Sequence, residues 1–113
     1  MNEPDALNAQ VVLERVRAQA IAENVRITQH AQQEMAEEDI TLDEVLQTIA
    51  SAQLLGNYPE HRRGPCCLLS GRTANGRPAH IVCTTAQPVL IIITVYEPKP
   101  PKWVTPTQRR QER

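Results

Sequence analysis

The chain has 113 residues, a length that fits one compact domain and leaves little room for a second. Its formal net charge of -1 excludes a uniformly basic nucleic-acid binder, and 41% hydrophobic residues exclude a disordered tail. Phenylalanine is absent and aromatic residues make up only 3%, which predicts an aliphatic core and excludes a base-stacking platform of several rings.

The two halves of the chain carry opposite charge. Residues 1–60 hold 11 acidic and three basic side chains, a net charge of -8, whereas residues 61–113 hold nine basic and two acidic side chains, a net charge of +7. The basic half could bind an anion or an acidic partner. Alternatively, the two halves neutralise each other within one fold.

The sequence also predicts where the protein resides. Its start has no basic segment, and its longest apolar run, Val89 to Ile93, is far shorter than the roughly 20 residues that span a bilayer. Cys66, Cys67 and Cys83 are an odd number without C-x-x-C spacing, so a disulfide framework is not expected. We therefore expect a cytoplasmic protein with reduced thiols and no membrane partner.

The first half of the chain predicts helices. Apolar residues recur at three- and four-residue steps over residues 6–24, as in an amphipathic helix. A short helix is expected over Gln29–Glu37 behind Thr28, a candidate N-cap. Thr41 to Glu44 has the pattern of a capping box, which predicts a third helix ending near Ala52.

The second half predicts strands, at Gln53–Tyr58, Cys66–Arg72, Ala79–Ala86 and Val89–Glu97. Asn75-Gly76 is the strongest hairpin signal, and such short connections require antiparallel neighbours. We therefore expect an α+β domain over residues 1–105, with N-terminal helices packed on a three- to four-stranded antiparallel meander. From Pro98 the chain should leave the sheet as an extended arm, with residues 106–113 as a basic C-terminal tail.

Strand parity predicts a polar sheet face. On the last strand one apolar face should pack on the helices: Val89, Ile91, Ile93 and Val95. The opposite face could gather Arg72, His80, Thr94 and Tyr96, which would supply a cation for a phosphate, a proton-transfer histidine and hydroxyl groups. The alternative is a half-solvated sheet face without chemistry.

His30 is a second candidate for proton transfer. Glu34 follows it by four residues and could hold one imidazole tautomer, although a structural histidine that ties the helix to its neighbours has the same pattern. The histidines and cysteines show no zinc-binding spacing, and the chain has no P-loop or G-x-G-x-x-G motif. We therefore expect neither a metal site nor a cofactor.

Several motifs in order along the chain resemble the DUF4258-type domain family. They are Thr28-Gln29-His30-Ala31, Gly76-Arg77-Pro78-Ala79-His80-Ile81-Val82 and Ile93-Thr94-Val95-Tyr96-Glu97-Pro98, followed by Trp103. The family is similar in fold to the RelE and BrnT toxins, which are ribonucleases with helices against a curved antiparallel sheet. The resemblance implies a RelE-like toxin fold. The positions that it marks are His30, His80, Thr94, Tyr96 and Trp103, and of these His30, His80 and Tyr96 are the candidate catalytic residues.

The chain departs from the family near its first histidine, where many members have arginine and this sequence has Glu34 and Glu38. These carboxylates would repel an RNA backbone. An RNA site is therefore expected on the sheet and its loops, at Arg62, Arg63, Arg72 and Arg77.

Two hypotheses follow from these residues. The first is an RNA-binding protein or ribonuclease of toxin-antitoxin type. The second is a non-catalytic interaction module, in which the sheet face or the edge at Gln53–Tyr58 binds an antitoxin-like protein or a second copy in a homodimer.

Overall fold

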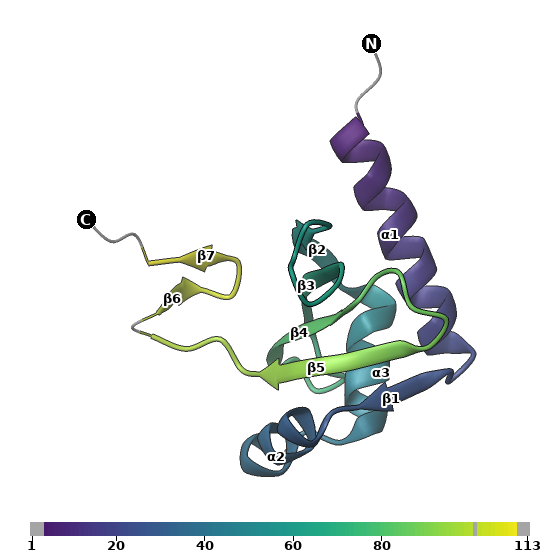
Figure 1. Ribbon diagram of the computed structural model, residues 1–113. Coiled ribbons are helices and arrows are strands. Elements are labelled where there is room, and N and C mark those ends of the chain that lie inside the picture. Colours follow the sequence, from purple (N-terminus) through teal and green to yellow (C-terminus); the bar gives the residue numbers. More distant parts are fainter. Residues whose placement is uncertain (1–3, 101, 111–113) are drawn as a thin grey trace.

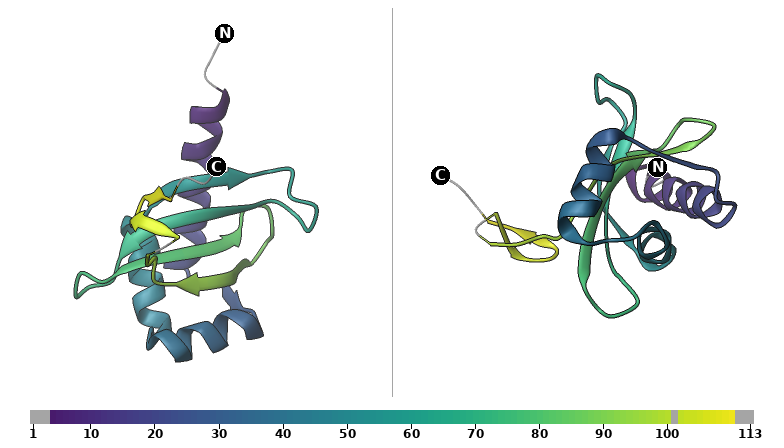
Figure 2. Two further views of the ribbon diagram at one scale, coloured as in Figure 1. Left: turned by 90° about the vertical axis from the view of Figure 1, so that its left-hand side faces the viewer. Right: turned by 90° about the horizontal axis from the view of Figure 1, so that it is seen from below.

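The structure is a computed structural model that describes residues 4–100 and 102–110 (Figure 1). Its helices are α1 (Pro4–Ile21), α2 (Gln29–Glu38) and α3 (Leu42–Ser51). Its strands are β1 (Val25–Ile27), β2 (Gln53–Tyr58), β3 (Cys66–Arg72), β4 (Pro78–Thr84), β5 (Leu90–Tyr96), β6 (Trp103–Thr105) and β7 (Gln108–Arg109). α1 and α3 cover one face of the sheet of β1 to β5, and the hairpin of β6 and β7 stands on the opposite face (Figure 2). We call this opposite face the hairpin face.

Local capping signals fix the helix starts as the sequence predicts. The Thr28 side chain accepts a hydrogen bond from the Ala31 backbone N–H at the start of α2. Thr41 and Glu44 form the complete capping box before α3. α2 ends where Asp39 adopts a left-handed conformation, with φ of 56°. None of the described helices combines the length and apolar character needed to cross a lipid bilayer.

The main sheet has the strand order β1-β5-β4-β3-β2 and is mixed. The expected antiparallel pairing is confirmed from β2 to β5, but β1 pairs in parallel with β5. The prediction of a purely antiparallel meander is therefore wrong. β1 has only three residues, which is too short for an alternating hydrophobic pattern to identify it as a strand. Its partner β5 also lies far along the chain, so no local signal indicates the pairing.

A bulge in β5 changes which of its side chains face the helices. Val82 pairs with Thr94 and Cys83 pairs with Ile92, so Ile93 is the extra residue. Leu90, Ile92 and Val95 are fully buried in the core. The predicted core face of Val89, Ile91, Ile93 and Val95 is therefore correct only for Val95, because the extra residue shifts the parity.

α2 lies along the edge of β5 and pairs with its backbone beyond the end of β1. The backbone N–H groups of Val95 and Glu97 donate to Glu34 Oε1 and Glu38 Oε1, at 2.8 and 3.3 Å. Four residues along a helix rise about 6 Å and two residues along a strand about 6.6 Å, so the two spacings match. The carboxylates of Glu34 and Glu38 thus accept the backbone N–H groups of β5 that the carbonyl groups of another strand would otherwise accept.

The C-terminal segment returns to the sheet and does not remain an extended arm. β6 and β7 pair in an antiparallel hairpin, which the Arg110 N–H extends by donating to the Lys102 carbonyl at 2.7 Å. Trp103 packs onto His80 on the hairpin face, and only 6% of it is exposed. Residues 106–110 of the expected basic tail belong to this hairpin, and residues 111–113 lie outside the described residues.

α3 packs closely on β3 at Gly71. A Cβ built on Gly71 would lie 2.8 Å from Thr48 Cγ2 and 3.0 Å from the Thr48 carbonyl oxygen. Thr48 is fully buried and its hydroxyl donates to the Glu44 carbonyl at 2.7 Å, so it has little freedom to move. The helix position therefore depends on a residue without a side chain at this point.

Gly71→Ala is expected to lower the free energy of unfolding by about 1–3 kcal/mol, because the added methyl overpacks the contact with α3. Urea unfolding measures this change. Thr48→Ser removes Cγ2 and keeps the hydroxyl, so adding it to Gly71→Ala should restore part of the loss. A Gly71→Ala protein as stable as the unaltered chain would contradict the close packing.

Candidate functional site

The structure brings His80 and Tyr96 together on the hairpin face. They are direct partners in the β4–β5 register, and His80 Nδ1 lies 3.1 Å from the Tyr96 hydroxyl. Trp103 from the hairpin meets the imidazole edge-on, with ring centroids 4.4 Å apart. His80 is 0% exposed. The predicted pair is thus formed, but it lies beneath the hairpin.

Both ring nitrogens of His80 are used in these contacts. Nε2 bonds the Pro106 carbonyl oxygen, which can only accept, so Nε2 carries the proton. Nδ1 is then the acceptor for the Tyr96 hydroxyl. Burial lowers the pKa of His80, and it raises the pKa of Tyr96. In this hairpin-docked form, neither nitrogen is available to a substrate.

A pocket of about 340 Å³ opens beside Tyr96. We call it the lysine pocket; its lining residues are Glu34, Thr94, Tyr96, Glu97, Lys99, Lys102 and Trp103. Lys102 is exposed and makes no ion pair with any described residue. Of the pocket's two carboxylates, Glu97 is paired with Arg77 and Glu34 accepts the neutral Val95 N–H, so the pocket contains both acidic groups and the lysine that has no ion pair to a described residue.

His30 is linked to the lysine pocket through its contact with Glu34, which lines that pocket. Its Nε2 lies 3.4 Å from Glu34 Oε2, and the His30 side chain is 65% exposed. The other oxygen of Glu34 accepts the Val95 N–H. The structure therefore places His30 at the sheet edge, apart from the buried pair of His80 and Tyr96.

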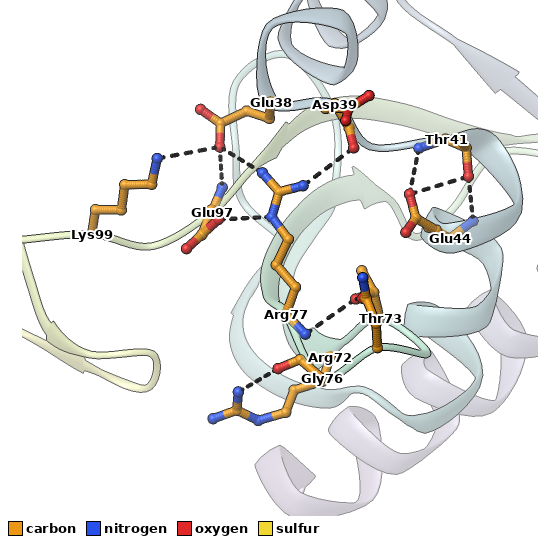
Figure 3. A network of polar contacts seen from close by, with 11 residues as sticks. Glu38, Asp39, Thr41, Glu44, Arg72, Thr73, Gly76, Arg77, Glu97 and Lys99 are labelled. Atoms are coloured by element: carbon orange, nitrogen blue, oxygen red, sulfur yellow. Dashed lines mark hydrogen bonds and ion pairs between the residues drawn. The ribbon is translucent and has the colours of Figure 1, made fainter.

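Arg77 lies in a network of carboxylates that joins α2 to β4 and β5 (Figure 3). Its guanidinium lies 2.8 Å from Glu97 and 3.6 Å from Glu38, and it donates to the Asp39 carbonyl at 3.2 Å. The hydrogen bond to Glu97 raises the pKa of Arg77. Lys99 adds a fourth group, 3.9 Å from Glu38. The charge of Arg77 is thus balanced inside the protein.

The remaining predicted arginines are exposed and lie in two separate places. Arg72 is the last residue of β3 and donates to the Gly76 carbonyl in the turn between β3 and β4. Arg62 and Arg63 lie in the loop between β2 and β3. None of the three makes an ion pair with a residue that the structure describes.

Sequence reasoning missed the two lysines of the lysine pocket and the role of the acidic residues. Glu34 and Glu38 were expected to repel an RNA backbone, but they bind backbone N–H groups, Arg77 and Lys99. Their four-residue spacing is the signal for one shared helix face, although it does not reveal the strand edge beneath it. Among the described residues, no three His, Cys, Asp or Glu side chains cluster as a metal site would require.

Acidification should weaken the docking of the hairpin. Because burial lowers the pKa of His80, the docked form binds fewer protons than the undocked form between that lowered value and about pH 6.5. Docking is therefore most stable above about pH 6.5 and weakens as the pH falls below it. Trp103 is the only tryptophan in the chain, so we expect its emission to shift to the red on acidification while far-ultraviolet circular dichroism persists.

His30→Gln and His61→Gln serve as matched controls for this titration and should keep the emission shift. His80→Asn should remove its pH dependence in the same range. If His80→Asn and the unaltered protein titrate identically, the shift does not arise from His80.

Arg77→Lys is expected to lower the free energy of unfolding by roughly 1–2 kcal/mol, because lysine cannot bridge Glu97, Glu38 and the Asp39 carbonyl together. Urea unfolding again provides the measurement. Arg72→Lys is the matched control, since exposed Arg72 makes a single contact, and it should change stability by less than about 0.5 kcal/mol. Equal losses in the two variants would show that the carboxylate network adds no stability.

Comparison with known proteins identifies the family of this fold and site. Residues 27–97 match DUF4258, described as a domain of unknown function. The matched range begins at the last residue of β1 and ends just after β5, so it contains α2, α3, the strands β2 to β5, His80 and Tyr96. No curated protein and no solved structure matches the chain. The match covers more than half of the residues, and the chain therefore belongs to the DUF4258 family.

Proposed function

We propose that this protein binds RNA on its hairpin face. The observation that supports the proposal is the position of the cations without an ion pair to a described residue. Lys102 lines the lysine pocket, and Arg63 lines a second pocket. The two pockets are neighbours, because Thr94 lines both. Arg109, on β7, adds a further exposed cation on the hairpin. Several cations on one face suit a phosphate backbone.

Ion pairs on the acidic side chains near the lysine pocket also favour the hairpin face as the site of RNA binding. Glu38 and Glu97 are paired with Arg77, and Glu34 is held by a backbone N–H group. Two of these three carboxylates are thus ion-paired beside the lysine pocket, where Lys102 makes no ion pair with a described residue. On the helical side, Arg17 donates to the backbone carbonyls of Ile49 and Ala52 and is committed to the fold.

Binding, and not cleavage, is the activity that we propose for the hairpin-docked form. General acid and base catalysis needs a proton-transfer group within hydrogen-bond reach of the substrate. His80 is fully buried and bonds Tyr96 and Pro106, so it is the anchor of the hairpin in this proposal. We also propose that the protein is of the toxin-antitoxin type, that its fold is similar to that of the RelE and BrnT toxins, and that it resides in the cytoplasm, where RNA is present.

The edge of β2 favours a second candidate, a protein partner that pairs with it, such as an antitoxin-like protein or a second copy. Tyr58 is 46% exposed at the end of this edge strand. A bulge between Leu54 and Gly56 interrupts the register, and irregular edges pair poorly with further strands. RNA binding is therefore the better supported function.

Fluorescence anisotropy with a labelled single-stranded RNA tests the proposal at several salt concentrations. Affinity should fall steeply with salt, and Lys102→Gln should lower the slope of log K against log salt by about 0.7 if Lys102 contacts one phosphate. Arg15→Gln is the matched control, because it removes one exposed positive charge from α1 on the opposite side of the sheet. Equal effects of the two variants, or binding without salt dependence, would contradict the proposed face.

The integrity of the same RNA after incubation distinguishes binding from cleavage. We expect intact RNA at pH 7.5, where the hairpin is docked. Cleavage that disappears in His80→Ala and Tyr96→Phe would instead assign the activity to a ribonuclease. A stable dimer without RNA binding would favour the edge of β2.

A further inference from the structure

A second pocket lies on the hairpin face, where the loop between β2 and β3 meets β3, β4 and β5. Its volume is about 320 Å³, at the lower end of the range of small-ligand sites. We call it the His61 pocket, after the loop histidine that lines it together with Arg63. It adjoins the lysine pocket, because Thr94 lines both.

The polar side chains of the His61 pocket are able to donate hydrogen bonds. His61 Nδ1 accepts the Arg63 backbone N–H at 3.2 Å, so the neutral imidazole carries its proton on Nε2. Thr84 Oγ1 accepts the Ile91 N–H at 3.0 Å, which leaves its own hydroxyl proton to donate. Thr94 and the Arg63 guanidinium supply further donors.

The surroundings of these donors are suited to a negatively charged ligand. No acidic residue lines the pocket, in contrast to the lysine pocket with its two carboxylates. Burial raises the pKa of the Cys66 thiol, which therefore stays uncharged at neutral pH. Val82 and Ile93 add apolar side chains to the lining. This combination fits an anionic group attached to a partly apolar body.

We infer that the His61 pocket binds the phosphate group of a nucleotide, with Arg63 and His61 on the phosphate and the nucleoside against Val82 and Ile93. Arginine binds phosphate oxygens through two parallel N–H groups, and a histidine and two hydroxyl groups complete the donor set. The inference rests on the proposed function in taking RNA as the source of this phosphate. A free mononucleotide offers the same chemistry.

Binding of uridine 3′-monophosphate, followed by ¹H–¹⁵N and imidazole resonances in NMR titrations, tests the inference. We expect the backbone amides of Thr84 and Thr94 and the His61 imidazole to shift, and the exposed His30 imidazole to stay unchanged. Uridine without phosphate should bind at least tenfold more weakly. Inorganic phosphate should shift His61 without moving the amide of Val82.

Arg63→Gln and Arg62→Gln form a matched pair, because both arginines are exposed neighbours and only Arg63 lines the pocket. Arg63→Gln should raise the Kd for the mononucleotide at least tenfold, and Arg62→Gln should change it by less than twofold. Unchanged Trp103 emission in both variants verifies that the fold is intact. Equal losses in the two variants, or no shift at Thr84 and Thr94, would overturn the inference.

Titration with the labelled RNA separates this inference from the proposed function. Mononucleotide binding at Arg63 without RNA binding would keep the pocket, assign it to free nucleotides and refute the proposed function. RNA binding that is equally strong in Arg63→Gln and Arg62→Gln, with no mononucleotide binding, would refute the pocket and keep the function. Parallel losses of both ligands in Arg63→Gln alone would support both.

Discussion

The backbone edge of β5 is the constraint on which the arrangement of this protein depends. β1 is too short to pair with all of β5, and unpaired backbone groups at a partly buried edge are costly. α2 meets this need through Thr28, which donates to the Ile93 carbonyl, and through Glu34 and Glu38, which accept the N–H groups of Val95 and Glu97. These contacts place His30 at the edge of the sheet and form one wall of the lysine pocket.

The hairpin of β6 and β7 decides how much of the opposite sheet face stays accessible. It covers His80 with Trp103 and Pro106, so the most reactive side chain of that face holds the fold together in the docked form. The two pockets that share Thr94 stay accessible, and Lys102 and Arg63 in their linings make no ion pair with a described residue. In the function that we propose, structural and ligand-binding roles are thus divided between neighbouring positions on the same strands.

The opposite charges of the two sequence halves become partly balanced in space. Arg77 joins Glu38 from the acidic half, and Lys99 lies near the same carboxylate. The ion pairs between the two halves are therefore concentrated where α2 meets the start of β4 and the end of β5. Lys102 and Arg63 make no ion pair with a described residue. The halves thus neutralise each other in part at this junction, whereas the binding of an anion or an acidic partner by the basic half stays a prediction.

The sequence by itself determined the features that depend on residues within a few positions of each other. The caps at Thr28 and Thr41, the turn at Asn75-Gly76 and the strands β2 to β5 follow from local backbone preferences and side-chain alternation. The antiparallel pairing of β4 with β5 also followed, because two strands joined by a short loop must be neighbours, whereas the register that sets His80 opposite Tyr96 did not. Only the tertiary structure decided the parallel pairing of β1, the bulge at Ile93 and the return of the hairpin onto His80. The pairing of β1 and the return of the hairpin join segments far apart in the chain, and the bulge lies between consecutive strands. All three depend on burial and backbone pairing that no local pattern encodes.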